Sequence, residues 1–373
     1  MGNFKGIAPE QQYLAREVGL RYISDEAPGI SRRRAGKGFS YFDSRGQRIR
    51  DRAELARIKA LATPPGWKDV WICPRPDGHI QVTGRDNKGR KQYLYHPLWR
   101  ELRDRTKFEQ MAAFGRALQV IRDTTDRHLR LHGLSREKIL AAVVRLLEAT
   151  LVRIGNKEYE RENRSFGLTT LKDEHLRITG SLMHFRFRGK GGKEHSVKFH
   201  DRRLAKVVKR CQDLPGHELF QYSDENGENR AIDSSDVNSY LQEITGQEFT
   251  AKDFRTWGGT VHAAVALMEL GSFGSLTEAN RKVVEAVKHA ASRLGNKPAA
   301  CRKYYIHPGI IQAYLEQRLI ATMQAAIDRE VEEQISRLQS EERGVLAILE
   351  DSAEEGLKTE ARKTMVQRGD VSD

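Results

Sequence analysis

The stretch that decides the fold is HLRITGSLMHFRFRGKGGKEHSVKFH, residues 175–200. Apolar and polar residues alternate before and after the turn GKGG at 189–192, and a period of two predicts a β-hairpin. Helical sequence lies on both sides of it: Ser135 caps a helix predicted over 136–152, and helices resume from Asp201. A hairpin set between helices predicts a mostly helical domain that contains a small sheet.

The first 96 residues have the opposite balance and predict a small, β-rich domain. Two segments, 71–86 and 87–97, contain turn residues and extended runs with alternating apolar positions. A short helix with Asp51 as its cap is predicted over 51–62. From Pro97 the period becomes helical. We therefore expect an α+β fold: a β-rich N-terminal domain (1–96), a mostly α-helical domain (97–320) and a helical C-terminal tail (321–373).

The tail differs from the rest of the chain in charge. Residues 321–373 contain 13 acidic and 7 basic residues, a net charge of −6. Apolar residues recur near its start at intervals of three and four, which predicts one apolar helix face. They are Ile320, Met323, Ile327, Val331, Ile335 and Leu338. That face could dock on the body of the protein, pair with another chain or fray.

Positive charge is concentrated in the body of the protein. The whole chain has a formal net charge of +13 and a pI near 9.6, so residues 1–320 carry +19. A surface this basic favours a polyanionic partner. A basic soluble protein without such a partner is the alternative that charge alone leaves open.

Several other classes of protein find no support in the sequence. Cys73, Cys211 and Cys301 lie far apart and form no CxxC pair, which argues against a disulfide framework and a zinc site. No segment approaches 18 consecutive apolar residues, and the first residues lack the apolar core of a signal peptide. The segment GRDNKGRK (84–91) approaches a phosphate-binding loop but has Arg where that loop needs Lys. We expect a cytoplasmic protein that uses neither a metal nor a nucleotide.

Five scattered residues suggest one reaction when they are considered together. They are Arg153 in LVRIGN (151–156), Lys190 in RGKGGK (188–193), Arg255 in KDFRTWGG (252–259), and Asn296 and Tyr305 in RLGNKPAACRKYYIHP (293–308). Taken alone, an arginine at a helix end can bind terminal carbonyls, a hairpin lysine can be merely solvated, and a tyrosine can simply pack. A phosphodiester under attack spreads negative charge over its oxygens, so cations around one phenol suit that reaction.

These blocks, in this order, resemble those of the poxvirus and bacterial type IB DNA topoisomerases. That family has Arg in an R-x-G helix end, Lys on a G-K hairpin, Arg in D-[LF]-R-T, and G-H/N-x-P nine residues before the catalytic tyrosine. The spacing from Asn296 selects Tyr305 over its neighbour Tyr304. The glycines after Arg255 in RTWGG allow close approach of backbone to backbone or to phosphate.

The N-terminal region also resembles this family, through GFSYF (38–42), PPGWKDVWI (64–72) and GRKQYLYHP (89–97), so the resemblance covers about residues 20–320. It implies that Gln92, Tyr93 and Tyr95 face DNA. An amide can read base edges and phenols can bind phosphates, although packing on the strand stays an equal alternative for one of the two tyrosines.

The resemblance implies a two-lobed clamp around duplex DNA, monomeric and nucleoid-associated, that works without ATP or metal. Tyr305 would attack a phosphate and form a 3′-phosphotyrosyl link. Arg153 and Arg255 would hold the non-bridging oxygens, and Lys190 would protonate the departing 5′-oxygen. Asn296 stands where the viral enzymes have histidine. An amide can donate a hydrogen bond but has no titratable proton, so a histidine's proton transfer cannot be carried over to this chain.

Two other functions remain open from sequence. A tyrosine recombinase shares the catalytic-domain fold and the Arg, Lys, Arg, Tyr order, but it usually carries a helical front domain and a histidine in place of Asn296. A DNA-binding protein with a decayed site is the other alternative, and the presence of all five residues argues against it.

Overall fold

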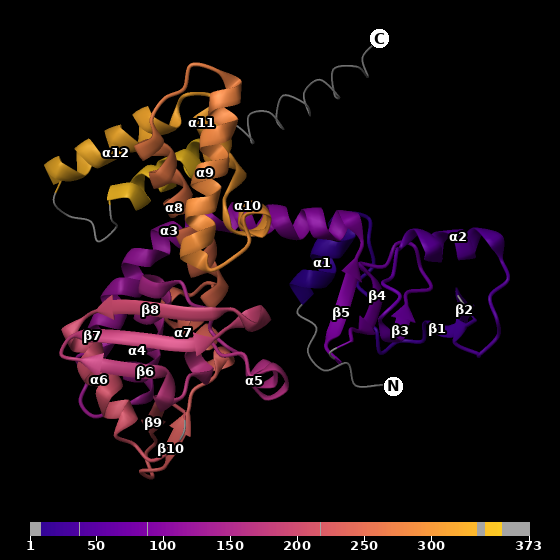
Figure 1. Cartoon of the computed structure of the whole chain (residues 1–373), viewed down its shortest axis with the longest axis horizontal. Helices are drawn as coiled ribbons and strands as arrows, with labels where there is room; N and C mark the ends of the chain where they lie inside the picture. The colour runs from indigo at the N-terminus through magenta and orange to yellow at the C-terminus, as the bar shows by residue number, and fades with distance from the viewer. Residues whose placement is uncertain (1–8, 37, 88, 217, 334–339, 353–373) are drawn as a thin grey trace. The chain divides into compact units, whose positions relative to one another are not determined.

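The computed structural model describes residues 9–36, 38–87, 89–216, 218–333 and 340–352. The chain divides into two compact units, Met1–Lys107 and Phe108–Asp373, which Figure 1 shows coloured along the sequence. Helix α3, Pro97–His128, begins in the first unit and ends in the second. Within the described residues, no helix is both long enough and apolar enough to cross a membrane.

The first unit is built on an antiparallel five-stranded sheet with the strand order β2-β1-β3-β4-β5. The strands are β1 (Ile30–Ala35), β2 (Gly38–Phe42), β3 (Lys68–Ile72), β4 (Ile80–Arg85) and β5 (Lys91–Tyr95). Helix α2 (Arg52–Ala60) confirms the predicted short helix, because the Asp51 carboxylate accepts a hydrogen bond from the backbone nitrogen of Glu54 at 2.7 Å. Helix α1 (Pro9–Glu17) was not predicted.

The second unit confirms the predicted hairpin between helices. Strands β7 (Leu182–Arg188) and β8 (Glu194–His200) pair in antiparallel register, and β6 (Leu176–Thr179) extends them to three strands. A two-stranded sheet of β9 (Gln221–Ser223) and β10 (Asn229–Ala231) was missed. The helices after α3 are α4 (Arg136–Thr150), α5 (Lys157–Asn163), α6 (Arg202–Gln212), α7 (Ser234–Thr245), α8 (Ala251–Leu270), α9 (Leu276–Leu294), α10 (Pro298–Tyr305), α11 (Pro308–Leu315) and α12 (Leu319–Glu333).

The described part of the acidic tail docks on the second unit. Helical residues 340–352 bury Val345, Ile348 and Leu349, and Met323 of α12 packs against Gly344. Ile320 and Met323 of the predicted apolar face also pack on the core of this unit, which supports the docking alternative for that part of the face. Ile335 and Leu338 of the predicted apolar face lie outside the described residues, as does the side chain of Val331.

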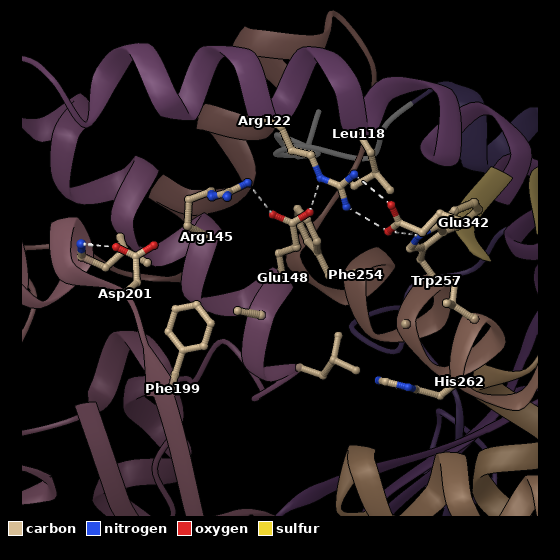
Figure 2. Close-up of a pocket in the computed structure, with 15 residues that line it drawn as sticks. Leu118, Arg122, Arg145, Glu148, Phe199, Asp201, Phe254, Trp257, His262 and Glu342 are labelled. Carbon is tan, nitrogen blue, oxygen red and sulfur yellow. Dashed lines mark hydrogen bonds and ion pairs between the residues drawn. The ribbon is translucent and has the colours of Figure 1, made fainter. Parts of the chain in front are cut away.

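A buried ion cluster joins this C-terminal segment to the helices beneath it, beside a pocket of about 490 Å³ (Figure 2). Arg122 of α3 lies between Glu148 of α4, at 2.6 Å, and Glu342, at 2.8 Å. The indole nitrogen of Trp257 on α8 donates to the Glu342 carboxylate at 3.0 Å. One acidic side chain of the tail thus connects to α3 and α8, and through Arg122 to α4.

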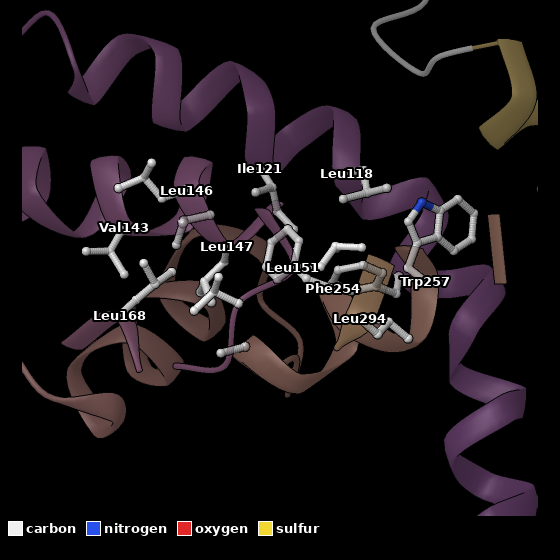
Figure 3. Close-up of a cluster of buried hydrophobic side chains, with 14 of the residues drawn as sticks. Leu118, Ile121, Val143, Leu146, Leu147, Leu151, Leu168, Phe254, Trp257 and Leu294 are labelled. Carbon is white, nitrogen blue, oxygen red and sulfur yellow. The ribbon is translucent and has the colours of Figure 1, made fainter. Parts of the chain in front are cut away.

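The main hydrophobic core lies where α3, α4 and α8 meet, and Figure 3 shows part of it. Helix α4 is the most deeply buried of these, with nine buried residues between Lys138 and Leu147. Ser135 caps it as predicted, through its hydroxyl and the backbone nitrogen of Lys138. The helix ends earlier than expected, at Thr150, because Leu151 adopts a left-handed conformation with φ of 53°.

Candidate active site

Arg255 is fixed by the ends of two helices. It lies in the second turn of α8, which starts at Thr250 with a capping box to Asp253, and its side chain is buried with 4% exposure. Its guanidinium donates to the carbonyl of Leu151 at the end of α4, and to the carbonyl of Leu294 at the end of α9 at 2.9 Å. Terminal helix carbonyls carry partial negative charge, so both contacts favour the buried cation.

Asn296 joins the two predicted arginines. It follows α9 directly, and its side-chain oxygen accepts hydrogen bonds from Arg153 at 2.5 Å and from Arg255 at 3.4 Å. Its amide nitrogen is buried and, like the Nε atom of Arg255, has no hydrogen-bond partner among the described residues. Asn296 therefore acts toward the arginines as a hydrogen-bond acceptor, a role that the sequence did not predict. Its amide nitrogen donates to none of the described residues.

The sequence predicted Arg153 at the end of a helix, and this is wrong. Helix α4 ends at Thr150, and Arg153 lies two residues beyond its C-cap Leu151 in a non-helical segment. Its backbone carbonyl accepts from the nitrogen of Leu168 at 2.9 Å. Gly155 and Gly167 allow this approach, since a Cβ on Gly167 would lie 2.5 Å from the Arg153 carbonyl oxygen. The side chain is half-buried and extends to Asn296.

Tyr305 is the last residue of α10 and is held against α8. The hydroxyl of Thr260 donates to the Tyr305 carbonyl at 3.2 Å, and a Cβ on Gly259 would lie only 2.6 Å from that oxygen. At Gly259 the predicted close approach is therefore one of backbone to backbone, whereas Gly258 faces the side chain of Leu151. Because Arg255 and Gly259 are four residues apart on one helix face, the same face supplies the cation and seats the tyrosine. The guanidinium carbon of Arg255 lies 5.3 Å from the centre of the Tyr305 ring.

The charges around the phenol change its acidity. Burial acts to raise the pKa of Tyr305, but the charges of Arg255, Arg153 and Lys252, together with a hydrogen bond from Arg255, lower it below the ordinary 10.0. For Arg255, burial and the nearby Arg153 lower the pKa to about 10, while Tyr305 raises it. A phenol beside such cations gives up its proton more readily, as a nucleophile must.

Lys190 is not among the bonded partners of these four residues in the described part of the chain. It is exposed at the tip of the β7–β8 hairpin, where Gly191 and Gly192 both have positive φ. Tyr304, the rival nucleophile, is 42% exposed, and the ammonium of Lys303 lies 5.3 Å from its ring. The structure thus brings together Arg153, Arg255, Asn296 and Tyr305, and leaves Lys190 on a short solvent-facing turn.

The three predicted DNA-facing residues belong to β5 in the first unit. Tyr93 is 44% exposed, and its ring stacks on that of Tyr95 with 5.9 Å between centres. Tyr95 also packs against a small core that contains Leu20 and Trp99, so its partial burial fits the packing alternative. The Gln92 amide donates to Asp86 at 3.0 Å.

Two residues near the site were missed by sequence reasoning. Lys252, in the first turn of α8, helps to lower the pKa of Tyr305, and His195, on strand β8, lies close enough to Arg153 and Arg255 for their charges to lower its own pKa. Lys252 could have been noticed because it lies three residues before Arg255, on the same helix face. His195 carried no comparable signal, since its neighbours come from distant segments.

Comparisons with known proteins agree on one family. The family model described as the catalytic core of eukaryotic DNA topoisomerase I matches residues 96–334, and that of the N-terminal domain of bacterial DNA topoisomerase IB matches residues 38–86. The catalytic match includes Arg153, Lys190, Arg255, Asn296 and Tyr305, and it ends before the docked segment 340–352.

Individual relatives give the same result. DNA topoisomerase 1B of Acanthamoeba polyphaga mimivirus is 28% identical over 295 residues, which are 77% of this chain and 87% of the relative. DNA topoisomerase 1B of Vaccinia virus (strain Copenhagen) and DNA topoisomerase I of Monkeypox virus are each 20% identical over 239 residues, 64% of this chain and 73% of the relative. The first family model alone spans more than half of the sequence. The chain therefore belongs to the type IB DNA topoisomerases.

Proposed function

We propose that this topoisomerase relaxes supercoiled duplex DNA by cutting and resealing one strand, with Tyr305 as the nucleophile. The phenolic oxygen bonds to a backbone phosphorus, the bond from phosphorus to the 5′-oxygen breaks, and a 3′-phosphotyrosyl link forms. The phenol gives its proton to water, and the 5′-oxygen takes a proton from Lys190. After the free strand rotates, the 5′-hydroxyl attacks the phosphotyrosine and reverses both steps.

The contact between Arg255 and Tyr305 is the strongest support for this role. The guanidinium carbon is fixed 5.3 Å from the centre of the phenol ring, and the charge of Arg255 acts to lower the pKa of Tyr305. A cation held there before DNA binds can stabilise charge on the phenol and then on the phosphate oxygens without reorganising. Arg153 would hold the same phosphate from the other side of Asn296.

Asn296 would serve the reaction in two ways. Its oxygen orients both guanidinium groups. Its amide nitrogen, a buried donor that the described residues do not use, would donate to a non-bridging phosphate oxygen. This division of labour needs no titratable proton at position 296.

The substrate would be duplex DNA, bound by one copy of the protein at the nucleoid, with Tyr93 as an exposed contact to the DNA backbone. We propose that neither ATP nor a metal takes part. The phosphotyrosyl link keeps the energy of the broken phosphodiester, so resealing needs no nucleotide. Two arginines, a lysine and an amide would supply the charge stabilisation that the phosphoryl group requires.

The nucleophile can be tested with matched tyrosine variants. A duplex oligonucleotide whose downstream fragment, which carries the new 5′-hydroxyl, diffuses away after cleavage should trap a covalent adduct with the wild-type protein and with Tyr304→Phe, but not with Tyr305→Phe. DNA binding by Tyr305→Phe should be unchanged, because only the hydroxyl is lost. Peptide mapping of the adduct identifies the modified tyrosine. Plasmid relaxation by Tyr305→Phe, or an adduct on Tyr304, would refute the assignment.

The same preparation distinguishes the recombinase alternative. A topoisomerase should relax plasmids that carry no special site, because supercoil strain drives strand rotation wherever the enzyme cuts. Activity confined to paired defined sites, with exchange of strands between them, would instead indicate recombination.

A further inference from the structure

His195 lies between the hairpin that carries Lys190 and the turn that carries Asn296. Its imidazole projects from β8 and stacks on Phe187, its partner across the hairpin, with ring centres 5.1 Å apart and planes within 9°. The Phe187 side chain is itself buried in the core of the second unit. The histidine ring is therefore held flat on a rigid base.

Two glycines contact this ring from different segments. A Cβ on Gly189 would lie 2.5 Å from the imidazole Cδ2 atom, and a Cβ on Gly295 would lie 2.8 Å from Cε1. Either distance is too short for a real side chain, so both positions must lack one for the ring to fit. Gly189 directly precedes Lys190, and Gly295 directly precedes Asn296.

The ring is placed in a cationic environment that favours its neutral form. Burial, followed by the charges of Arg153, Lys193 and Arg255, lowers the pKa of His195, against a small opposing effect of Glu194. A neutral ring separates the two segments without adding a positive charge that would repel the Lys190 ammonium or the arginines.

We propose that His195 is a positioning residue for DNA cleavage: its ring sets the distance between the Lys190 turn and the Asn296 turn, and so places the lysine as the general acid. This inference rests on the proposed function, in which Lys190 protonates the departing 5′-oxygen. Without the ring, the glycine-rich tip Gly189–Gly192 has no side chain other than that of Lys190 itself to fix its distance from the Asn296 turn. The ammonium would then sample many positions and seldom meet the 5′-oxygen.

The chemistry of the leaving group separates this role from a general loss of structure. An alkoxide leaves poorly unless it is protonated, whereas a thiolate is a far weaker base and leaves without help. Replacing the bridging 5′-oxygen of the DNA by sulfur therefore removes the need for a general acid. A variant whose only fault is a misplaced Lys190 should recover on the sulfur substrate, and a variant with misplaced arginines should not.

The experiment measures single-turnover cleavage of matched oxygen and sulfur duplexes. On the oxygen substrate, His195→Ala should be slower than wild type by roughly 10², the lower end of a general acid's contribution. On the sulfur substrate it should approach the wild-type rate, as should Lys190→Ala, while Arg255→Ala stays slow on both. His195→Gln, which keeps a flat uncharged group, should restore part of the oxygen rate. His184→Ala on β7, whose ring bonds Ser196 at 2.8 Å, is the control on the same sheet and should cleave normally.

The outcomes distinguish a failure of the inference about His195 from a failure of the proposed general-acid role of Lys190. If His195→Ala and His195→Gln are equally slow on both substrates, or normal on both, His195 does not position the acid. If Lys190→Ala itself is not rescued by sulfur, the general-acid role of Lys190 fails, and the inference about His195 fails with it. Rescue of Lys190→Ala without rescue of His195→Ala overturns the inference alone and leaves the proposed function in place.

Discussion

The two guanidinium groups near Tyr305 differ in how deeply they are buried. Arg255 is buried and fixed by the carbonyls of Leu151 and Leu294, whereas Arg153 is half-buried and depends on Asn296 for its orientation. Arg255 is therefore already in place before DNA binds. In the proposed reaction, Arg153 would have more freedom to follow the phosphate as charge develops on it.

Arg255→Lys tests the fixed cation. Lysine keeps the charge but cannot bind two carbonyls and cover the phenol ring at once. We expect single-turnover cleavage to fall by roughly 10³–10⁵, the range for arginines in phosphoryl transfer. Arg230→Lys, on strand β10 where Arg230 pairs with Asp224, should leave the rate unchanged. A near-normal rate for a folded Arg255→Lys protein would show that charge alone is enough.

The pH dependence of cleavage tests the acidity of Tyr305. Nearby cations stabilise the phenolate and so lower the pKa of Tyr305 below 10.0. On the sulfur substrate, which needs no acid, the rate should rise with pH and reach half of its maximum below pH 10. Lys252→Gln removes one of those cations, so its profile should shift to higher pH. Lys206→Gln on α6, an exposed lysine, serves as the control and should not shift it.

At the scale of elements, α8 is the central support of the site. One face of it supplies Arg255 and seats Tyr305 at Gly259, and Trp257 connects the helix to Glu342 of the docked C-terminal segment. Fixing this helix from both sides limits how far the cation and the nucleophile can separate. The precision of the site thus depends on residues after position 334, beyond the part that matches the catalytic family model.

Glu342→Ala should reveal this support as lost stability. Removing Glu342 takes away one of the two carboxylates around the buried Arg122, leaving Glu148 alone, and also leaves the Trp257 indole without its acceptor. We expect the free energy of unfolding to fall by about 3 kcal/mol, the lower end of the range for a broken buried pair because Glu148 remains, measured by chemical denaturation of the whole chain. The control is Glu350→Ala, in the same C-terminal segment as Glu342, which breaks an exposed ion pair with Arg116 of α3. It should lower the free energy of unfolding by at most about 1 kcal/mol. Equal losses in the two variants would contradict a special role for Glu342.

Elements with strong local patterns could be predicted, and weak ones could not. The caps Asp51 and Ser135 marked α2 and α4 because each supplies a hydroxyl or carboxylate where a helix needs an acceptor. Strands β9 and β10 have three residues each, too few to show alternation. Helix α1, with sequence PEQQYLARE, has too few apolar residues to show a stripe.

The site itself was predictable only through the order of its motifs. Spacing along the chain could associate Asn296 with Tyr305, but it could not reveal that the Asn296 oxygen binds both arginines. His195 was missed because its neighbours, Gly189 and Gly295, are adjacent to it only in space. Burial of Glu342 was equally hidden, since an acidic residue is expected at the surface unless a partner is known.

For the whole molecule, the excess of positive charge dictates how DNA binding responds to salt. Residues 1–320 carry a formal +19, and a protein that neutralises phosphates releases condensed counterions. We expect log K to fall linearly with log salt, with a slope of about −0.9 for each phosphate contacted. Anisotropy titrations with a labelled duplex measure this slope. Tyr305→Phe should keep the wild-type slope, because the hydroxyl supplies no positive charge that could neutralise a phosphate, and a slope near zero would argue against backbone binding.

The docked segment 340–352 also sets an order of events in the making of the enzyme. Translation reaches Tyr305 before it reaches Glu342. The growing chain therefore contains Tyr305 before Arg122 and Trp257 can form their contacts with the Glu342 carboxylate. Helix α8, which carries Arg255, can therefore gain its contact with Glu342 only after the ribosome has passed Arg153, Lys190, Arg255, Asn296 and Tyr305.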